Sequence, residues 1–414
     1  MVLELTDMAP TGEAIGRHEG MVIFVPLSMP GERVEVELVH RRRNYARARL
    51  LQVLRPAPER VQPPCPYFGR CGGCEWQHIE LHAQRMFKTR AVKEQLSRIG
   101  KLPDVKVLDC LGTTHDYHYR NHIQLALTTQ GKPGYHQGGT TSVIEITECP
   151  TADPKLNELL HPRQEQPAAL VQCLQSEPAM ELRKDLREMH LRNGMPGDAP
   201  MIVMEQQDDR MVVVQGPGEL REHVHGHDYT ISPGSFFQVN TYVAGLLVDE
   251  VMSALAPRGT DDVLDLYCGV ALFTLPISET VRKVLGVEAS AEAIRDASAN
   301  LSGRTNTQLI HADVRDAFEH KDVRSVPWSA VVLDPPRAGV AHDTLVKLLA
   351  MRISRVIYVS CDPATLARDA RMMCDSGYTL GRVQPLDMFP QTHHVETVAT
   401  FTRLAEAAAP VYKP

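Results

Sequence analysis

The sequence has few aromatic residues and no long apolar segment. Aromatic residues make up 5% of its 414 residues and hydrophobic residues 43%, a balance typical of an ordinary globular protein. No segment approaches the roughly 18 consecutive apolar residues that a membrane-spanning helix requires. The first ten residues (MVLELTDMAP) also lack the basic and then apolar order of an export signal. We therefore expect a cytoplasmic protein that binds no membrane.

An excess of positive charge is also missing. The formal net charge is −7, which argues against a protein that binds nucleic acids over its whole surface. Two segments are nevertheless basic: residues 39–60 contain seven arginines and one Glu, and residues 81–106 contain seven Lys or Arg against Glu94 and Asp104. Such segments can bind an RNA backbone by releasing its counterions. A solvated charged surface is the alternative for either segment alone.

The lack of an export signal argues against disulfide bonds among the nine cysteines, because the cytosol keeps thiols reduced. Cys65, Cys71 and Cys74 have the close spacing of metal ligands, and Cys149 follows far downstream. Four thiolates suit either zinc or an iron–sulfur cluster, and their spacing does not distinguish the two. The isolated cysteines are expected to be structural: Cys110, Cys173, Cys268 and Cys374.

One cysteine lies where a parallel α/β sheet places its chemistry. The apolar run 356–359 predicts a strand, and Ser360, Cys361 and Asp362 lead from it to the helix-breaking Pro363. A thiol in such a turn can act as a nucleophile, because thiolate is the reactive form and exposure favours it. From position alone, a buried structural cysteine is an equally good interpretation.

The hydrophobic pattern changes along the chain and predicts three domains. Residues 1–57 alternate apolar and polar positions in short bursts, which predicts a small antiparallel β-barrel. Residues 58–235 contain the cysteine cluster and predict a central mixed α+β domain. Residues 236–414 alternate strand and helix patterns, which predicts an α/β domain with a doubly wound parallel sheet. The small-residue tail 405–414 is expected to fray.

The C-terminal domain lacks the G-x-G-x-x-G turn of a nicotinamide dinucleotide site. Its first strand ends instead at a glycine, Gly269, and its second ends at Glu288, an arrangement that suits the two hydroxyls of a ribose. S-adenosylmethionine fits best, since it has a ribose and no phosphate; a simple turn is the alternative. Asp334 and two prolines follow a third strand, and the prolines hold the carboxylate rigidly at the sheet edge.

Four segments together resemble the iron–sulfur RNA 5-methyluridine methyltransferases. They are Cys65–Cys74 with the following Gln77-His78, Gly234–Asn240, Asp334–Arg337 and Ser360–Pro363, and the resemblance covers nearly the whole chain. It implies a class I (Rossmann-like) methyltransferase domain that uses S-adenosylmethionine, and it implies that the barrel is a TRAM-like RNA-binding domain. It also implies a [4Fe–4S] cluster with four ligands: Cys65, Cys71, Cys74 and Cys149.

The resemblance further implies roles for individual residues. Cys361 would be the nucleophile and Glu396 the base. Where the family has a second glycine and a polar residue after Gly269, this chain has Ala271 and Leu272, so weaker binding of the methyl donor is expected. Contacts to the methyl donor are implied for five residues: Gln238, Tyr267, Glu288, Asp313 and Asp334.

The chemistry of uracil agrees with these two catalytic roles. Carbon 5 is a poor nucleophile, and addition of the Cys361 thiolate at carbon 6 creates an enolate whose carbon 5 can attack a sulfonium methyl. A base must then remove the carbon-5 proton. Glu396 opens an apolar strand, where burial would raise its pKa toward that of a useful base, although an exposed edge carboxylate is the alternative.

We therefore expect methylation of carbon 5 of a uridine in RNA by a monomer, through a covalent cysteine–uracil adduct. The resemblance implies large-subunit (23S) ribosomal RNA ahead of transfer RNA as the substrate. The uridine must leave its stack to be reached. Two alternatives stay open: a catalytically weakened RNA-binding protein of the same fold, and a zinc-stabilised methyltransferase with another substrate.

Overall fold

The structure is a computed structural model that describes residues 1–162 and 167–403; the tail for which fraying is expected lies outside these residues. Contacts between residues divide the chain into two compact units. Unit 1 comprises Met1–Ala91, Thr113–Leu220 and Phe389–His394. Unit 2 comprises Val92–Gly112, Arg221–Met388 and the residues from Val395 on. The helix α1 (Leu81–Arg98) therefore begins in unit 1 and ends in unit 2.

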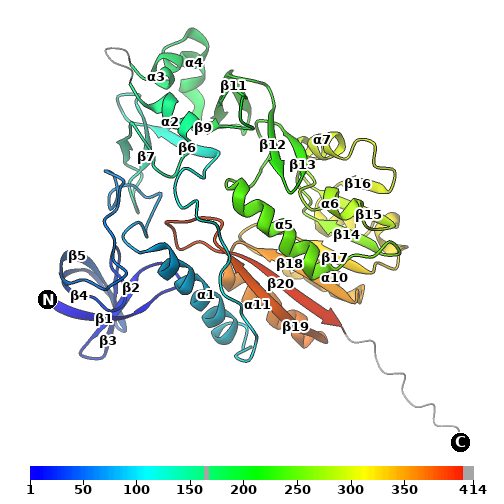
Figure 1. Cartoon of the computed structure of the whole chain (residues 1–414), viewed down its shortest axis with the longest axis horizontal. Helices are drawn as coiled ribbons and strands as arrows, with labels where there is room; N and C mark the ends of the chain where they lie inside the picture. The colour runs from blue at the N-terminus through cyan, green and yellow to red at the C-terminus, as the bar shows by residue number, and fades with distance from the viewer. Residues whose placement is uncertain (163–166, 404–414) are drawn as a thin grey trace, which may run out of the picture. The chain divides into compact units, whose positions relative to one another are not determined.

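Unit 1 opens with a closed five-stranded barrel, drawn in blue in Figure 1. The alternation of apolar and polar residues places side chains such as Leu3, Ile23, Val36 and Ala46 in its interior. The expected barrel is confirmed, but one pair of neighbours, β3 and β5, is parallel. Five strands cannot all alternate in direction around a closed ring. The strands are β1 (Val2–Met8), β2 (Ala14–His18), β3 (Met21–Val25), β4 (Arg33–Arg41) and β5 (Tyr45–Arg55).

A six-stranded sheet with the order β11-β10-β9-β6-β7-β8 makes up most of the rest of unit 1. One of its faces is apolar and packs on short helices, so Ile123, Met189 and Leu191 join Leu156 and Leu170 in one core. Its elements are β6 (His122–Leu127), β7 (Pro133–His136), β8 (Val143–Glu145), α2 (Pro154–Leu160), α3 (Ala169–Leu174), α4 (Glu177–Leu182), the 3-10 turn Arg183–Asp185, β9 (Leu186–Arg192), β10 (Met201–Gln206) and β11 (Met211–Gln215).

Unit 2 contains the expected doubly wound sheet, with the strand order β16-β15-β14-β17-β18-β20-β19. Its first five strands in that order are parallel. The strands are β14 (Asp262–Leu266), β15 (Lys283–Glu288), β16 (Thr307–His311), β17 (Ala330–Leu333), β18 (Arg355–Ser360), β19 (Tyr378–Leu386) and β20 (Glu396–Arg403). A two-stranded hairpin of β12 (Leu220–Val224) and β13 (His227–Ile231) precedes them.

Helices cover both faces of this sheet because its central strands are apolar on both sides. The helix α5 packs on β17, β18, β19 and β20, as the green helix in Figure 1 shows. On the other face, α10 and α11 bury Leu345, Leu348 and Leu366 against the strands. The helices are α5 (Thr241–Leu255), α6 (Thr274–Ser278), α7 (Ala291–Asn300), α8 (Val314–Ala317), α9 (Lys321–Arg324), α10 (His342–Ala350) and α11 (Pro363–Asp375).

The strand β20 departs from a purely parallel sheet. It pairs antiparallel with both β18 and β19, and it lies between them. The short connection from β19 to β20 allows only an antiparallel pair, because a parallel pair requires a crossover of a dozen or more residues. As a result, the start of β20 meets the end of β18.

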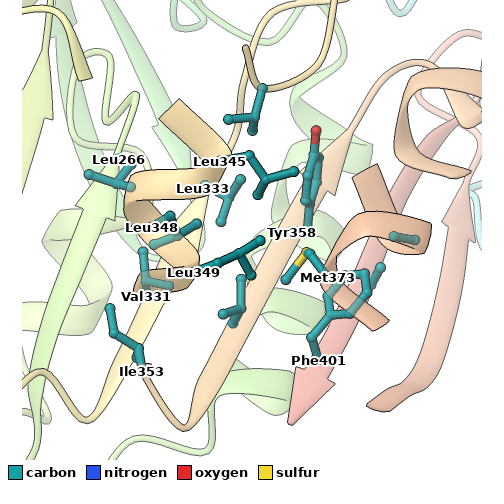
Figure 2. Packing of buried hydrophobic residues seen from close by; sticks show 14 of the residues in the cluster. Leu266, Val331, Leu333, Leu345, Leu348, Leu349, Ile353, Tyr358, Met373 and Phe401 are labelled. Carbon is teal, nitrogen blue, oxygen red and sulfur yellow. The ribbon is translucent and has the colours of Figure 1, made fainter. Parts of the chain in front are cut away.

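The core beneath this part of the sheet is shown in Figure 2, where Leu333, Tyr358, Met373 and Phe401 pack together. Each of these four side chains is fully buried. Among the described residues, no helix combines the length and apolar character needed to span a membrane.

Truncation of Phe401 should destabilise unit 2 strongly. Phe401→Ala removes a ring with no exposed surface, so we expect a loss of roughly 3–5 kcal/mol. Hydrogen exchange of the β18 and β20 amides measures this loss within the unit. Val346→Ala is the control, since Val346 in α10 is 45% exposed and its truncation should change stability by no more than about 0.5 kcal/mol. Equal effects of the two variants would contradict this account of the core.

Candidate functional site

Cys361 lies in the turn between β18 and α11, at the carboxyl edge of the sheet. The turn is held by Asp362, which caps α11 by accepting the N–H groups of Ala364 at 2.8 Å and Thr365 at 2.9 Å. Pro363 occupies the first turn of the helix, where its missing N–H costs nothing. The side chain of Cys361 is half-buried. The local sequence thus presents the thiol at the position that the strand pattern predicts.

Two carboxylates reach this thiol from the neighbouring strands. Because Ser360 of β18 pairs with Thr397 of antiparallel β20, the preceding residue Glu396 comes opposite Cys361. Glu396 is buried, with 3% of its surface exposed. On the other side, Asp334 directly follows β17, the parallel neighbour of β18. The fold therefore gathers three side chains that the sequence places far apart.

The charges of this group act on one another. Burial, together with the charges of Glu396 and Asp334, raises the pKa of the Cys361 thiol to about 11, and Arg337 opposes this shift. Burial and the charge of Asp334 raise the pKa of Glu396 well above its usual range. Burial raises the pKa of Asp334 to about 7. These three side chains therefore tend to retain their protons near neutral pH. Once Glu396 is deprotonated, its carboxylate is a stronger base than an exposed carboxylate.

Glu288 ends β15 beside the turn that follows β14. Its Oε2 accepts the Gly269 N–H at 3.0 Å and its Oε1 accepts the Ser290 N–H at 2.7 Å. Gly269 has a φ of +54°, a left-handed conformation that favours glycine. Each carboxylate oxygen has a second lone pair, so Glu288 can still accept hydrogen bonds from a diol.

The other residues expected at the methyl donor also belong to unit 2. Burial, with the charges of Asp313, Asp369 and Asp343, raises the pKa of Tyr267 to about 12. Asp313 is exposed and caps α8 by accepting the Arg315 N–H at 2.8 Å. Gln238 is buried, in the segment that leads into α5. Tyr267, Glu288, Asp313 and Asp334 thus follow or end successive strands at one edge of the sheet.

The segment with Ala271 and Leu272, which differs from the pattern of the family, still forms a turn. Ala271, at the position of the second glycine, adopts a φ of +76°, which is unfavourable for a residue with a Cβ. The Leu272 side chain is buried with 8% exposed, and its carbonyl oxygen accepts the Tyr229 hydroxyl at 3.1 Å. The leucine therefore contributes to the core, and it offers no polar group to a ligand.

Asp265 is a buried carboxylate outside the set of residues expected at the site. The Thr274 hydroxyl donates to its Oδ2 at 2.5 Å, whereas its Oδ1 has no hydrogen-bond partner among the described residues. Burial, with the charges of Asp334 and Glu288, raises the pKa of Asp265 to about 7. An acidic residue inside the apolar strand Val263–Leu266 is the signal that marks it, since an isolated buried charge is costly.

The four clustered cysteines line one pocket of unit 1 together with Gln77, Arg120 and Tyr135. Burial, together with the neighbouring thiols, raises the pKa of Cys71 to about 11 and that of Cys74 to about 12. The remaining two members of the set are Cys65 and Cys149.

This donor set fits a bound metal centre. Four mutually repelling thiolates in a buried pocket need a cationic centre, and the nearby Arg120 favours their charged forms only in part. The Gly73 N–H lies 3.4 Å from Cys71 Sγ and the Tyr135 hydroxyl 3.8 Å from Cys149 Sγ, so both can donate to ligand sulfurs. Both zinc and an iron–sulfur cluster satisfy this arrangement.

Comparison with known proteins identifies the family. The family model described as tRNA (Uracil-5-)-methyltransferase matches residues 207–404, and the TRAM domain model matches residues 2–51. The 23S rRNA (uracil(1939)-C(5))-methyltransferase RlmD of Pectobacterium atrosepticum is 33% identical, over 97% of this chain and 93% of that protein. The enzyme of the same name from Shewanella amazonensis is 34% identical, over 97% and 95%.

The chain belongs to the RNA uracil-5 methyltransferase family. A crystal structure of the Pyrococcus abyssi tRNA (uracil-54, C5)-methyltransferase in complex with S-adenosyl-L-homocysteine is also similar, with a TM-score of 0.73 and 26% identity. The match covers 97% of this chain and all of that one. This methyltransferase is therefore an enzyme that depends on S-adenosylmethionine and acts on RNA, which confirms the expected activity and the TRAM-like barrel.

The thiol of Cys361 should respond to the charge of Asp334. Asp334→Asn removes a neighbouring negative charge, so the pKa of Cys361 should fall below about 11 and alkylation by iodoacetamide should become faster. The acceleration should be present above the Asp334 pKa of about 7 and disappear at lower pH, where the wild-type carboxyl is already protonated. Mass spectrometry of the tryptic peptide Val356–Arg368 measures the rate, because Cys361 is its only cysteine.

Asp375→Asn is the matched control for this experiment. It removes an exposed carboxylate from α11 that pairs with Arg371. Its alkylation rate should equal that of the wild type. Equal rates for the Asp334 variant at every pH would show that the carboxylate does not act on the thiol.

Proposed function

We propose that this methyltransferase modifies carbon 5 of a uridine in large-subunit ribosomal RNA through a covalent adduct with Cys361. The observation that carries the proposal is the register of β18 and β20, which sets Glu396 opposite the thiol. The 23S rRNA enzymes that are 33% and 34% identical support the ribosomal substrate. Transfer RNA is the second candidate, because the matching family model and the similar crystal structure are both of tRNA methyltransferases.

The methyl donor would be held at the carboxyl edge of the unit 2 sheet. S-adenosylmethionine supplies an electrophilic methyl group on a sulfonium. Glu288 has lone pairs free for the ribose hydroxyls beyond those that bind Gly269 and Ser290. The half-buried Tyr267 offers its ring to the adenosine part, and Asp313, Asp334 and the buried Gln238 are the other proposed contacts.

The first chemical step belongs to Cys361. Its thiol gives up a proton to solvent and the thiolate sulfur bonds to carbon 6 of the uracil, which moves the electron pair of the 5,6 double bond toward carbon 5 and the carbonyl oxygen. Carbon 5 then bonds to the methyl group as the methyl–sulfur bond of the donor breaks, and the electron pair of that bond stays on the sulfur of S-adenosylhomocysteine. The charge of Arg337 favours the thiolate, since it lowers the Cys361 pKa.

The second step belongs to Glu396. The carboxylate takes the carbon-5 proton, the 5,6 double bond forms again, and the Cys361 sulfur leaves as a thiolate. Burial suits Glu396 to this task because it raises the pKa of the carboxyl and so makes the carboxylate a stronger base. Because Glu396 lies opposite Cys361, its carboxylate can reach carbon 5 of the same uracil whose carbon 6 is bonded to the Cys361 sulfur.

The four thiols of Cys65, Cys71, Cys74 and Cys149 are proposed to hold a [4Fe–4S] cluster. Uracil methylation transfers no net electrons, so the cluster would stabilise the fold or orient RNA. The donor set and its burial support a metal centre.

The RNA is proposed to contact the barrel, whose exposed hairpin Arg41–Arg43 provides positive charge. We propose that the chain works as a monomer with three domains: residues 1–57 for RNA, 58–235 for the cluster and 236–414 for methylation.

Deletion of the gene should remove one 5-methyluridine from large-subunit ribosomal RNA and none from transfer RNA. Mass spectrometry of digested RNA locates the lost methyl group. The wild-type gene should restore it, and Cys361→Ala should not, because without the thiol carbon 5 lacks the electron density for methyl transfer. Loss of a methyl group from transfer RNA instead would favour the second candidate substrate.

Glu396→Gln provides the complementary experiment in vitro. Addition and methyl transfer do not need the base, so this variant should accumulate a protein–RNA adduct that survives denaturing electrophoresis. The adduct should be absent for Cys361→Ala. Unchanged turnover of Glu396→Gln would remove Glu396 from the base role, and full activity of Cys361→Ala would refute the covalent mechanism.

Anaerobically purified protein should contain about four iron atoms and as much acid-labile sulfide per chain. Cys149→Ala should lower both contents, since it removes one of the four pocket thiols. The control Cys173→Ala should leave them unchanged, because Cys173 lies in α3, outside the pocket. One zinc per chain without sulfide would contradict the cluster.

A further inference from the structure

Asp369 is a buried carboxylate in the middle of α11 that no step of the proposed chemistry uses. Its side chain is 3% exposed. Its Oδ2 accepts the Tyr358 hydroxyl at 2.7 Å and the Val340 N–H at 3.0 Å, and its Oδ1 accepts Nε of Arg368 at 2.8 Å. The ring of Tyr358 is itself fixed in the core, as Figure 2 shows. A buried carboxylate is tolerated only with such partners, and here three donors satisfy it.

The same helix also binds the loop that leads from β17 to Val340. Nη2 of Arg368 donates to the carbonyl oxygens of Ala338 at 3.0 Å and Val340 at 3.2 Å. The Thr365 hydroxyl lies 3.2 Å from the carbonyl oxygen of Arg337 and can donate to it. Every residue from 337 to 340 except Gly339 is thus within hydrogen-bonding distance of α11.

Gly339 marks how closely the loop approaches the helix. Its φ is +75°, and a Cβ at this position would lie 2.6 Å from Nη2 of Arg368 and 2.8 Å from Oδ2 of Asp369. Any side chain would therefore be strained, and either the loop or the side chains of Arg368 and Asp369 would have to shift to make room for it. Glycine at this position thus allows the loop to lie directly against α11.

This loop connects Asp334, at the edge of the sheet, with the residues that contact α11. Its first residue, Asp334, is held by the sheet, since its N–H lies 3.3 Å from the carbonyl oxygen of Leu266. Arg337 is exposed and lies beyond the end of the strand, so its position depends on the contacts with α11. The helix itself begins at Pro363, two residues after Cys361. The charged groups that act on the thiol are Asp334 and Arg337 from this segment and Glu396 from β20.

We propose that Asp369 is a positioning residue for methyl transfer: by fixing the 337–340 loop on α11, it keeps the guanidinium of Arg337 beside the thiol of Cys361. The inference rests on the proposed function, in which that thiol is the nucleophile. The position of Arg337 relative to Cys361, however, is a property of the free protein and can be measured without RNA or methyl donor.

Asp369→Ala tests the proposal through the sign of its effect on the thiol. Loss of a negative charge by itself would lower the pKa of Cys361 and speed its alkylation. Release of the loop would instead weaken the influence of Arg337, raise that pKa and slow alkylation. We expect iodoacetamide to modify Cys361 roughly three- to tenfold more slowly at pH 8, the effect of about half to one pKa unit. The peptide Val356–Arg368 reports the rate.

Two further variants make the test independent of folding defects. Gly339→Ala displaces the loop while every charge is kept, and it should slow alkylation in the same direction. In an Arg337→Ala background, Asp369→Ala should have no additional effect, because the group through which it acts is already absent. The exposed Asp375→Asn in the same helix is the control and should leave the rate unchanged.

Three results would overturn the proposal. The first is faster alkylation in Asp369→Ala, which unfolding alone would also produce. The second is an unchanged alkylation rate in both Asp369→Ala and Gly339→Ala. The third is additive effects of Asp369→Ala and Arg337→Ala. Failure of the proposed function has a different signature. Full methyl transfer by Cys361→Ala would refute the catalytic role of the thiol and leave the alkylation rates unaffected.

Discussion

The pairing of β20 with β18 is the constraint on which the active site depends. Because the strands are antiparallel and Ser360 is opposite Thr397, Glu396 is delivered to the end of β18 that carries Cys361. A shift of one residue would turn Glu396 to the other face of the sheet, since side chains alternate along a strand. The apolar residues Val356, Tyr358, Ala399 and Phe401 maintain this register, because the shift would also remove them from the core.

The buried carboxyl groups of the active site lower the stability of the folded protein near neutral pH. Burial raises the pKa of Asp265 and Asp334 to about 7 and that of Glu396 well above its usual range, so the folded protein binds protons that the unfolded chain releases. A carboxyl with a raised pKa favours folding at low pH and opposes it once the group must ionise. The surrounding core offsets this cost, and the benefit is a base and a thiol whose protonation can be controlled by their neighbours.

The elements with strong hydrophobic periodicity were predictable from the sequence. The runs that correspond to β14, β15, β17 and β18 are apolar on both faces, and the barrel strands alternate. The parallel pairing of β3 with β5 and the antiparallel insertion of β20 were not predictable, because pairing is decided between strands and leaves no mark within one of them. Asp265 and Asp369 were also missed, because neither the apolar strand around Asp265 nor the charged helix around Asp369 identifies the partners of these carboxylates.

By itself the sequence determined which residue types are available for the chemistry: a thiol at a strand end, acidic residues at others and three closely spaced cysteines joined by a distant fourth. Local patterns were sufficient for these because turns, caps and strand ends depend on neighbouring residues. The tertiary structure decided which of them meet. Cys361, Asp334 and Glu396 come from three strands, and the loop bearing Arg337 is held by a helix that begins after Cys361. Strand order and register are properties of long-range packing, which no local segment encodes.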